Sequence, residues 1–290
     1  MAVMPMKRIS IYALKNRRKQ ILELIQRRGV VEIDDRKADE TVFAKMDTVP
    51  AKSRFENNAA ALQSALDALD KLEPPEKSLF ASLNGRDAIP LSKYQETADG
   101  ASELLKIASR INTLWKKCAD NRAEILRLQT QIRALKPWMK LDISMRTIST
   151  PTTSVFTGSF PVEYTEEPLR AKIAEGAPDV DGVVVEILSA SPQQTCAFLM
   201  CHISQGLKLE TYLRSIGFTY PAEPSKVPPA ERVDILNGRI AALQKEIDEN
   251  EAEIRTHKNR REDLLYTIDY FTMRTEKYDV LGRLWQSPHV

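Results

Sequence analysis

The chain has 290 residues, enough for one to three domains with a buried core. Its 42 Lys and Arg residues nearly balance 40 Asp and Glu residues, and the formal charge of +2 argues against a dedicated nucleic-acid-binding protein, which usually carries a large basic excess. With 42% hydrophobic and 28% charged residues, the composition is that of an ordinary folded protein and not of a disordered chain.

The first segment has the pattern of a small strand–helix–strand unit. Residues 7–14 alternate apolar and polar side chains, which predicts a half-buried strand, and residues 30–33 predict a second one. Between them an apolar stripe predicts a helix over residues 17–28, and Gly29 stands where a helix commonly ends in the left-handed conformation. Two strands and one helix cannot bury a core, so this lobe needs a partner from later in the chain.

The same segment is strongly basic. Residues 1–37 hold ten Lys or Arg and four Asp or Glu, a charge of +6, against −4 for the rest of the chain. The candidate basic docking face consists of Arg17, Arg18, Lys19, Arg27 and Arg28. It could meet anionic headgroups or an acidic protein; a merely solvated charged face is the equal alternative.

Three helical segments carry apolar residues at spacings of three and four. The first covers residues 52–72, the second 92–136, and the third begins at Pro229 and continues to about residue 284. In the second and third segments the spacing is a heptad seam. Because two long seams of similar length flank one intervening block, residues 104–135 and 233–271 are expected to pair as an antiparallel coiled coil within one chain, with the first helix packed alongside.

Polar residues interrupt these seams at Asn121, Asn250, His257 and Arg261. One hypothesis is that Asn250, His257 and Arg261 form a binding or proton-sensing site. The favoured interpretation is that all four fix the register of the coiled coil, a well-attested use of polar seam residues.

The block between the arms, residues 138–226, has an α/β pattern. Strands are predicted at 153–160, 182–188 and 195–203, and helices at 166–175 and 207–216. The order β-α-β-β-α, with residues 218–220 as a possible last strand, is that of a ferredoxin-like domain. The helices are expected on one face of the sheet, which leaves the other face open for docking.

No constellation of residues predicts catalysis, and neither a metal nor a cofactor is expected. There is no phosphate-binding glycine loop, and His202, His257 and His289 fall in unrelated segments. Cys196 and Cys201 lie five residues apart on a predicted strand, on opposite faces, and Cys118 lies in the seam. All three are expected to be reduced thiols in a cytosolic setting, and Cys196 and Cys201 are expected to be buried or half-buried small apolar side chains.

The ordered set of segments resembles a known family, subunit I of the bacterial and archaeal V/A-type rotary ATPases, homologous to eukaryotic subunit a. The resemblance spans essentially the whole chain and is clearest in MAVMPMKRISIYALKNRRKQILELIQRRGVVEI, FENNAAALQSALDALDKL, IRALKPW and FTMRTEKYDVLGRL. No single segment is a signature, but the ordered set with this architecture is specific.

The resemblance and the seams together imply an α+β fold in which a long antiparallel intramolecular coiled coil joins two small ferredoxin-like lobes. The expected domains are an N-terminal lobe at 1–50 completed by the C-terminal end, an outgoing helical arm at 51–137, a distal lobe at 138–226 and a return arm at 227–290. A strand is expected to begin at about His289 and to run beside the first lobe.

The resemblance also implies a function. The chain would be the non-catalytic cytoplasmic stator arm of a proton- or sodium-translocating ATPase, which resists rotor torque. Its partners at both lobes would be peripheral stalk subunits of the E and G type. It would also contact the membrane subunits and the central-stalk-side subunits of the complex, and it would not bind nucleic acid. In that family a membrane half follows, so the chain is expected to be the N-terminal part of an integral membrane protein, attached to the membrane through that half.

A rival function belongs to another class. A free-standing coiled-coil scaffold or a nucleic-acid-handling protein could also use long arms and a basic lobe. The near-neutral total charge weighs against nucleic acid.

Overall fold

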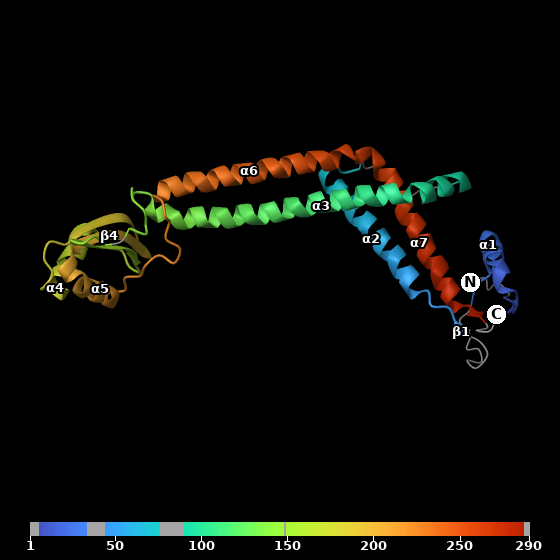
Figure 1. Ribbon diagram of the computed structural model, residues 1–290, viewed down its shortest axis with the longest axis horizontal. Coiled ribbons are helices and arrows are strands. Elements are labelled where there is room, and N and C mark those ends of the chain that lie inside the picture. The colour runs from blue at the N-terminus through green and yellow to red at the C-terminus, as the bar shows by residue number, and fades with distance from the viewer. Residues whose placement is uncertain (1–5, 34–43, 76–89, 148, 287–290) are drawn as a thin grey trace, which may run out of the picture. The chain divides into compact units, whose positions relative to one another are not determined.

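The computed structural model describes residues 6–33, 44–75, 90–147 and 149–286 of the chain. The chain divides into two compact units, unit 1 with residues 1–115 and 251–290 and unit 2 with residues 116–250 (Figure 1). Its helices are α1 (Arg18–Arg28), α2 (Val49–Leu72), α3 (Leu91–Leu135), α4 (Glu166–Gly176), α5 (Gly206–Ser215), α6 (Pro229–Thr256) and α7 (Arg261–Arg283). Its strands are β1 (Ala44–Lys45), β2 (Thr153–Phe160), β3 (Val184–Ser191), β4 (Gln194–His202) and β5 (Trp285–Gln286). The fold is therefore a mixture of long helices and two small sheets.

In unit 1, α2 lies antiparallel against α7. The Lys52 ammonium lies 2.9 Å from Asp279 at one end of the pair, and the Arg261 guanidinium lies 2.8 Å from Asp70 at the other. The Phe55 ring packs between Phe271 and Tyr278 with centroid distances of 6.1 and 5.2 Å. These contacts set the direction and register of α2 on α7.

The first part of α3 completes the core of unit 1. The Asn112 amide donates to the Ala61 carbonyl of α2 at 2.8 Å, and the Tyr94 ring lies 5.4 Å from the Tyr270 ring of α7. The side chains of Leu62, Leu69 and Ile111 are fully buried here. Burying each such side chain contributes about 1.5–3 kcal/mol, so this three-helix core supplies much of the stability of unit 1.

The return arm differs from its prediction. The seam predicts one helix to about residue 284, whereas the chain forms α6 and α7 with a 3-10 turn, Lys258–Arg260, between them. Beyond the turn, α7 packs on α2. The tertiary contacts with α2 thus outweigh the local helix preference at this point.

The N-terminal strands are also corrected. Residues 7–14 and 30–33 are irregular, and the only strand described before α2 is β1, which pairs antiparallel with β5. An alternating pattern makes a strand only where a neighbouring strand accepts its hydrogen bonds, and the described residues provide none for these two segments. The helix prediction is confirmed: α1 ends at Gly29, whose φ of 63° is left-handed. The strand expected at His289 lies outside the described residues.

Unit 2 contains an antiparallel three-stranded sheet in the order β2-β4-β3. Ser159 of β2 forms a further antiparallel bridge with Thr219, so this residue lies beside β2 at the sheet edge. The helices α4 and α5 cover one face, where Phe160, Leu169 and Leu213 are almost fully buried (Figure 1). All five predicted elements of this block are confirmed within a few residues.

The other face of this sheet is covered over β4, so the expectation of a face left wholly open for docking is wrong; on the same face Val184 of β3 is 48% exposed. Cys196 and Phe198 of β4 pack in one cluster with Trp138, Leu141 and Met145. Those three residues follow α3 and are themselves only 4–5% exposed. The sequence pattern of β2, β3 and β4 cannot show this, because the covering side chains come from an irregular segment.

In unit 2 the end of α3 pairs with α6. The Cys118 thiol donates to the Ile247 carbonyl at 3.8 Å, and the Asn121 amide donates to the Glu246 carboxylate at 3.1 Å. The residue numbers rise along α3 as they fall along α6, so the pair is antiparallel. Leu128 and Leu243 of the two helices lie in the same buried cluster.

Candidate functional site

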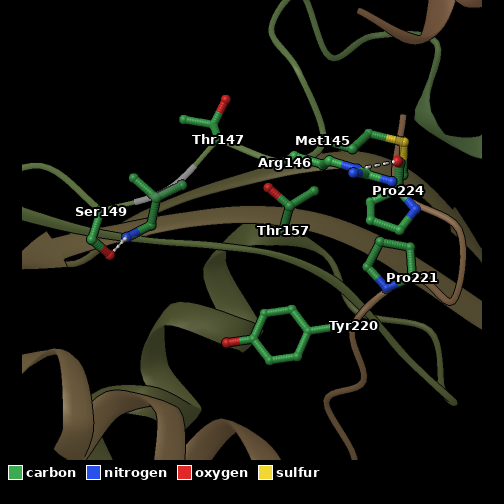
Figure 2. A pocket seen from close by; sticks show the side chains of 9 residues that line it. Met145, Arg146, Thr147, Ser149, Thr157, Tyr220, Pro221 and Pro224 are labelled. Atoms are coloured by element: carbon green, nitrogen blue, oxygen red, sulfur yellow. Dashed lines mark hydrogen bonds between the residues drawn. The ribbon is translucent and has the colours of Figure 1, made fainter. Parts of the chain in front are cut away.

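A shallow depression lies in unit 2 where the segment after α3, the strand β2 and the segment after Thr219 meet (Figure 2). Its volume is about 530 Å³. It is lined by Met145, Arg146, Thr147, Ser149, Val155, Thr157, Tyr220, Pro221 and Pro224. The walls are mainly apolar, and the polar groups come from Arg, Thr, Ser and Tyr side chains.

Hydrogen bonds hold the rim of this depression. The Arg146 Nε donates to the Pro224 carbonyl at 2.9 Å, which joins the two segments across the rim (Figure 2). The Ser149 hydroxyl accepts from the Val155 backbone N–H at 3.3 Å. Thr157 lies in the middle of the view, 5% exposed, and its hydroxyl has no partner among the described residues. The site therefore offers one buried hydroxyl and one guanidinium within an apolar surround.

Tyr220 is fixed by charged neighbours. Its hydroxyl donates to the Glu210 carboxylate at 3.1 Å, and the Arg214 guanidinium donates to the same carboxylate at 2.8 Å. The hydrogen bond from Arg214 lowers the pKa of Glu210, whereas burial, followed by the hydrogen bond to Glu210, raises the pKa of Tyr220. The phenol is thus kept neutral and the carboxylate ionised.

The lining residues of this depression include no carboxylate, imidazole or thiol. The lining hydroxyls of Ser, Thr and Tyr are weak nucleophiles at their usual pKa, and a Ser or Thr hydroxyl becomes an effective nucleophile when an adjacent base activates it. The arrangement can bind a small polar group beside an apolar one, and it does not supply a catalytic pair.

A second hollow, of about 430 Å³, lies in unit 1 between α2 and α7. Two of its charged groups pair with one carboxylate: Asp279 accepts from Lys52 at 2.9 Å and from Arg283 at 2.7 Å. The hydrogen bond from Lys52, followed by that from Arg283, lowers the pKa of Asp279, and the same pairing raises the pKa of Lys52. This hollow is a set of structural ion pairs along the helix pair.

The four predicted register residues fall into two groups. Asn121 and Asn250 belong to unit 2, where Asn121 bonds Glu246 and the buried Nδ2 atom of Asn250 has no partner among the described residues. They are not bonded to each other. Only Asn121 makes a contact across the seam that could specify register.

His257 and Arg261 flank the break between α6 and α7 in unit 1. His257 is the residue before the 3-10 turn, and its carbonyl accepts from the Arg260 N–H at 2.9 Å. The Arg261 guanidinium donates to Asp70 at 2.8 Å and to the Glu73 carbonyl, both at the end of α2. The heptad spacing predicts that Arg261 faces α3. Its guanidinium instead binds the end of α2.

The residues of the predicted basic docking face differ in their surroundings. Arg18 is half-buried and donates to the Gln286 side chain at 3.4 Å, while Arg17 donates to Gln20 at 3.2 Å. Lys19 and Arg28 are exposed. The side chain of Arg27 lies outside the described residues.

Within the described residues, no group of three or more His, Cys, Asp or Glu side chains could hold a metal ion. Cys118, Cys196 and Cys201 are buried and form no disulfide, and burial raises the pKa of Cys196 and Cys201. Among the helices in the described part of the chain, none combines the length and apolar character that a membrane span requires.

Sequence reasoning missed the depression in unit 2. Its residues come from three separate segments, and the hydroxyl of Thr157 becomes notable only because burial removes it from solvent. One local signal was present: Tyr220 ends the last predicted strand, and Pro221 and Pro224 make the segment after it stiff.

Comparisons with known proteins find similarity among solved structures. No family model matches the chain, and no curated protein matches it. A solved structure described as the cytoplasmic N-terminal domain of subunit I, homolog of subunit a, of V-ATPase is similar, with 17% sequence identity and a TM-score of 0.47 over 92% of this chain and 85% of that chain. The family named in that description is the one that the sequence resembles, subunit I of the V/A-type rotary ATPases.

Proposed function

We propose that the chain is a non-catalytic stator arm of an ion-translocating rotary ATPase, on the cytoplasmic side of the membrane. It would link peripheral stalks of the E and G type to the membrane motor and resist the torque of the rotor. The ordered resemblance of its segments to subunit I supports the identity of the complex. The pairing of its helices supports the mechanical part of the proposal.

One observation carries the proposal: α3 pairs antiparallel with the return segment in each unit. In unit 1 the Arg110 guanidinium makes two hydrogen bonds to Glu253 at 2.7 and 2.8 Å, and Arg260 donates to Glu103 at 2.7 Å. In unit 2 the contacts are those of Cys118 and Asn121 with α6. A helix of 45 residues that is paired in this way resists bending better than a single helix, because bending must also shear the packed seam.

The lobes supply the ends that such an arm needs. We assign the sheet and helices of unit 2 to the ferredoxin-like class, supported by the order Thr219-β2-β4-β3 with α4 and α5 on one face. For the N-terminal lobe the proposal is narrower: the pairing of β1 with β5 supports its completion by the C-terminal end of the chain. The described residues support no ferredoxin-like sheet there.

Copurification tests the proposal. A tagged chain, expressed in its own cells and isolated from detergent-solubilised membranes, should retain the stalk and rotary subunits of the ATPase, identified by mass spectrometry. A matched sample treated with nuclease tests the rival function. A nucleic-acid-handling protein would lose the proteins that copurify with it through nucleic acid. Recovery of the chain without any rotary ATPase subunit would contradict the stator function.

A direct binding experiment addresses the partner class. Purified stalk subunits should bind the chain, and Ile247→Asp, which buries a charge in the seam of unit 2, should weaken that binding if the paired arm presents the lobe. Ala241→Asp, at an exposed position of the same helix, is the matched control and should bind as the parent does. Equal binding by all three chains would show that the paired arm is not needed for stalk attachment.

A further inference from the structure

Most of the hydroxyl groups that line the depression in unit 2 already have a partner. The Ser149 hydroxyl accepts from a backbone N–H at 3.3 Å, and the Thr147 hydroxyl donates to a backbone carbonyl at 2.7 Å. The Tyr220 hydroxyl donates to the Glu210 carboxylate at 3.1 Å. The Thr157 hydroxyl differs, because it is buried without a partner among the described residues. A buried polar group normally has a partner, since leaving it without one costs free energy.

The strand β2 directs Thr157 into the depression. Its neighbour Phe156 packs in the core with α4 and α5, and side chains alternate along a strand, so Thr157 points to the opposite face of the sheet. On that face it stands opposite Phe198 of β4 in the antiparallel register. Figure 2 shows its side chain between those of Arg146 and Tyr220. The unpartnered hydroxyl therefore belongs to the floor of the depression.

Arg146 brings a positive charge to the same depression. Its Nε donates to the Pro224 carbonyl at 2.9 Å, and among the described residues this is the only hydrogen bond of the guanidinium. The two terminal nitrogens remain available, and such a fork matches the two oxygens of a carboxylate. None of the described lining residues is acidic, so none of them neutralises this charge.

The other walls of the depression are apolar. They are formed by Met145, Val155, Pro221, Pro224 and the ring of Tyr220. The volume of about 530 Å³ lies within the range of sites that bind small molecules. A few convergent polar groups within apolar walls are typical of such sites.

We propose that this depression binds a small organic carboxylate. The terminal N–H groups of Arg146 and the Thr157 hydroxyl donate to the carboxylate oxygens, and the apolar body of the ligand covers Val155 and the Tyr220 ring. An inorganic anion would leave these apolar walls uncovered, and a neutral apolar molecule would leave the guanidinium and the hydroxyl without a partner. The site goes beyond the stator function and does not depend on it, because all of its residues belong to unit 2.

Methyl-group nuclear magnetic resonance of the full chain tests the proposal with benzoate as the probe. Benzoate added to about 20 mM should shift the methyl signals of Val155 and Thr157, since a ligand with so few atoms binds in the millimolar range. Benzamide lacks the charge and acetate lacks the apolar body, so each should bind at least about fivefold more weakly. Absence of shifts with benzoate overturns the proposal, and equal binding of benzamide or acetate overturns the assigned chemistry.

Two variants identify the site, and each has a matched control. Thr157→Val removes the hydroxyl while keeping the shape of the side chain, and Arg146→Gln removes the charge; each should weaken benzoate binding at least about fivefold. Thr153→Val lies on the same strand outside the depression, and Arg170→Gln lies on α4. Both controls should bind benzoate as the parent does.

Folding does not confuse the result, because Thr157→Val leaves no buried hydroxyl without a partner, and its thermal unfolding midpoint should be at least that of the parent. Unchanged benzoate affinity in Thr157→Val or in Arg146→Gln would overturn the site. An equal loss in Arg170→Gln would mean general charge attraction and would overturn it as well.

Discussion

Arg261 shows how a polar residue in a heptad pattern can belong to a different partner. Its spacing places it in the seam of the return arm, yet its guanidinium donates to Asp70 and to the Glu73 carbonyl at the end of α2. The last carbonyls of a helix lack partners within the helix and favour a positive charge nearby. Arg261 thus joins the end of α2 to the start of α7.

Replacing Arg261 should destabilise unit 1. Arg261→Ala removes hydrogen bonds between a charged group and α2, and we expect a loss of about 1–2 kcal/mol in the free energy of unfolding, at the lower end of the range for charged partners because Asp70 is partly exposed. Urea denaturation followed by circular dichroism measures it. Lys258→Ala, at an exposed position of the neighbouring turn, should change the value by less than about 0.5 kcal/mol. A loss of the same size in both variants would contradict the role of Arg261.

At the scale of elements, the pairing of α3 with α6 depends on buried apolar residues at the seam. Ile247 is 2% exposed and its backbone carbonyl accepts from Cys118. Ile247→Asp places an ionisable group in this buried position, so the free energy of unfolding of unit 2 should fall by about 3–5 kcal/mol.

The measurement is thermal and urea unfolding of the parent, Ile247→Asp and the exposed control Ala241→Asp. The control introduces the same charge into the same helix and should lose no more than about 1 kcal/mol, mainly through helix propensity. If Ile247→Asp unfolded like the parent, the α3–α6 seam would not be the stabilising contact described here.

The elements also show where local patterns are insufficient. The heptad spacing continues through residues 257–261, yet the helix is interrupted there because α7 packs on α2. The alternation at residues 7–14 is that of a strand, but the described residues supply no neighbour to pair with it. In both cases the pattern describes which side chains are apolar, while the partner decides the backbone conformation.

At the scale of the whole molecule, both units contain carboxylates that are stabilised in their charged form. Arg110 lowers the pKa of Glu253 and Lys52 lowers that of Asp279 in unit 1, while Arg214 lowers the pKa of Glu210 in unit 2, each mainly through a hydrogen bond. A lowered folded-state pKa contributes stability above the unfolded-state pKa, near 4, and this contribution is lost as pH falls through the folded-state value.

We therefore expect the urea midpoint to be steady near neutral pH and to decrease below about pH 4.5. Arg110→Gln removes the partner of Glu253, so its midpoint should depend less on pH in this acidic range than that of the parent. Lys106→Gln, an exposed change on the same helix, should keep the parent's dependence. A midpoint that rose on acidification would show that these carboxylates are not stabilised in their charged form.

The sequence by itself determined the long helical segments, the order of elements in the distal block and the antiparallel pairing of two arms, because apolar periodicity and Pro or Gly boundaries are local signals. It also located the left-handed Gly29 and the resemblance to subunit I. These features require no knowledge of which distant residues meet.

Only the tertiary structure decided what lies against each face. Trp138, Leu141 and Met145 cover β4 on the sheet face opposite α4 and α5. The chain breaks at the Lys258–Arg260 turn, and beyond it Arg261 and α7 contact α2. The depression around Thr157 exists because three segments converge on one buried hydroxyl. Such contacts join residues far apart in the chain, and their free energy comes from packing and desolvation that no local pattern records.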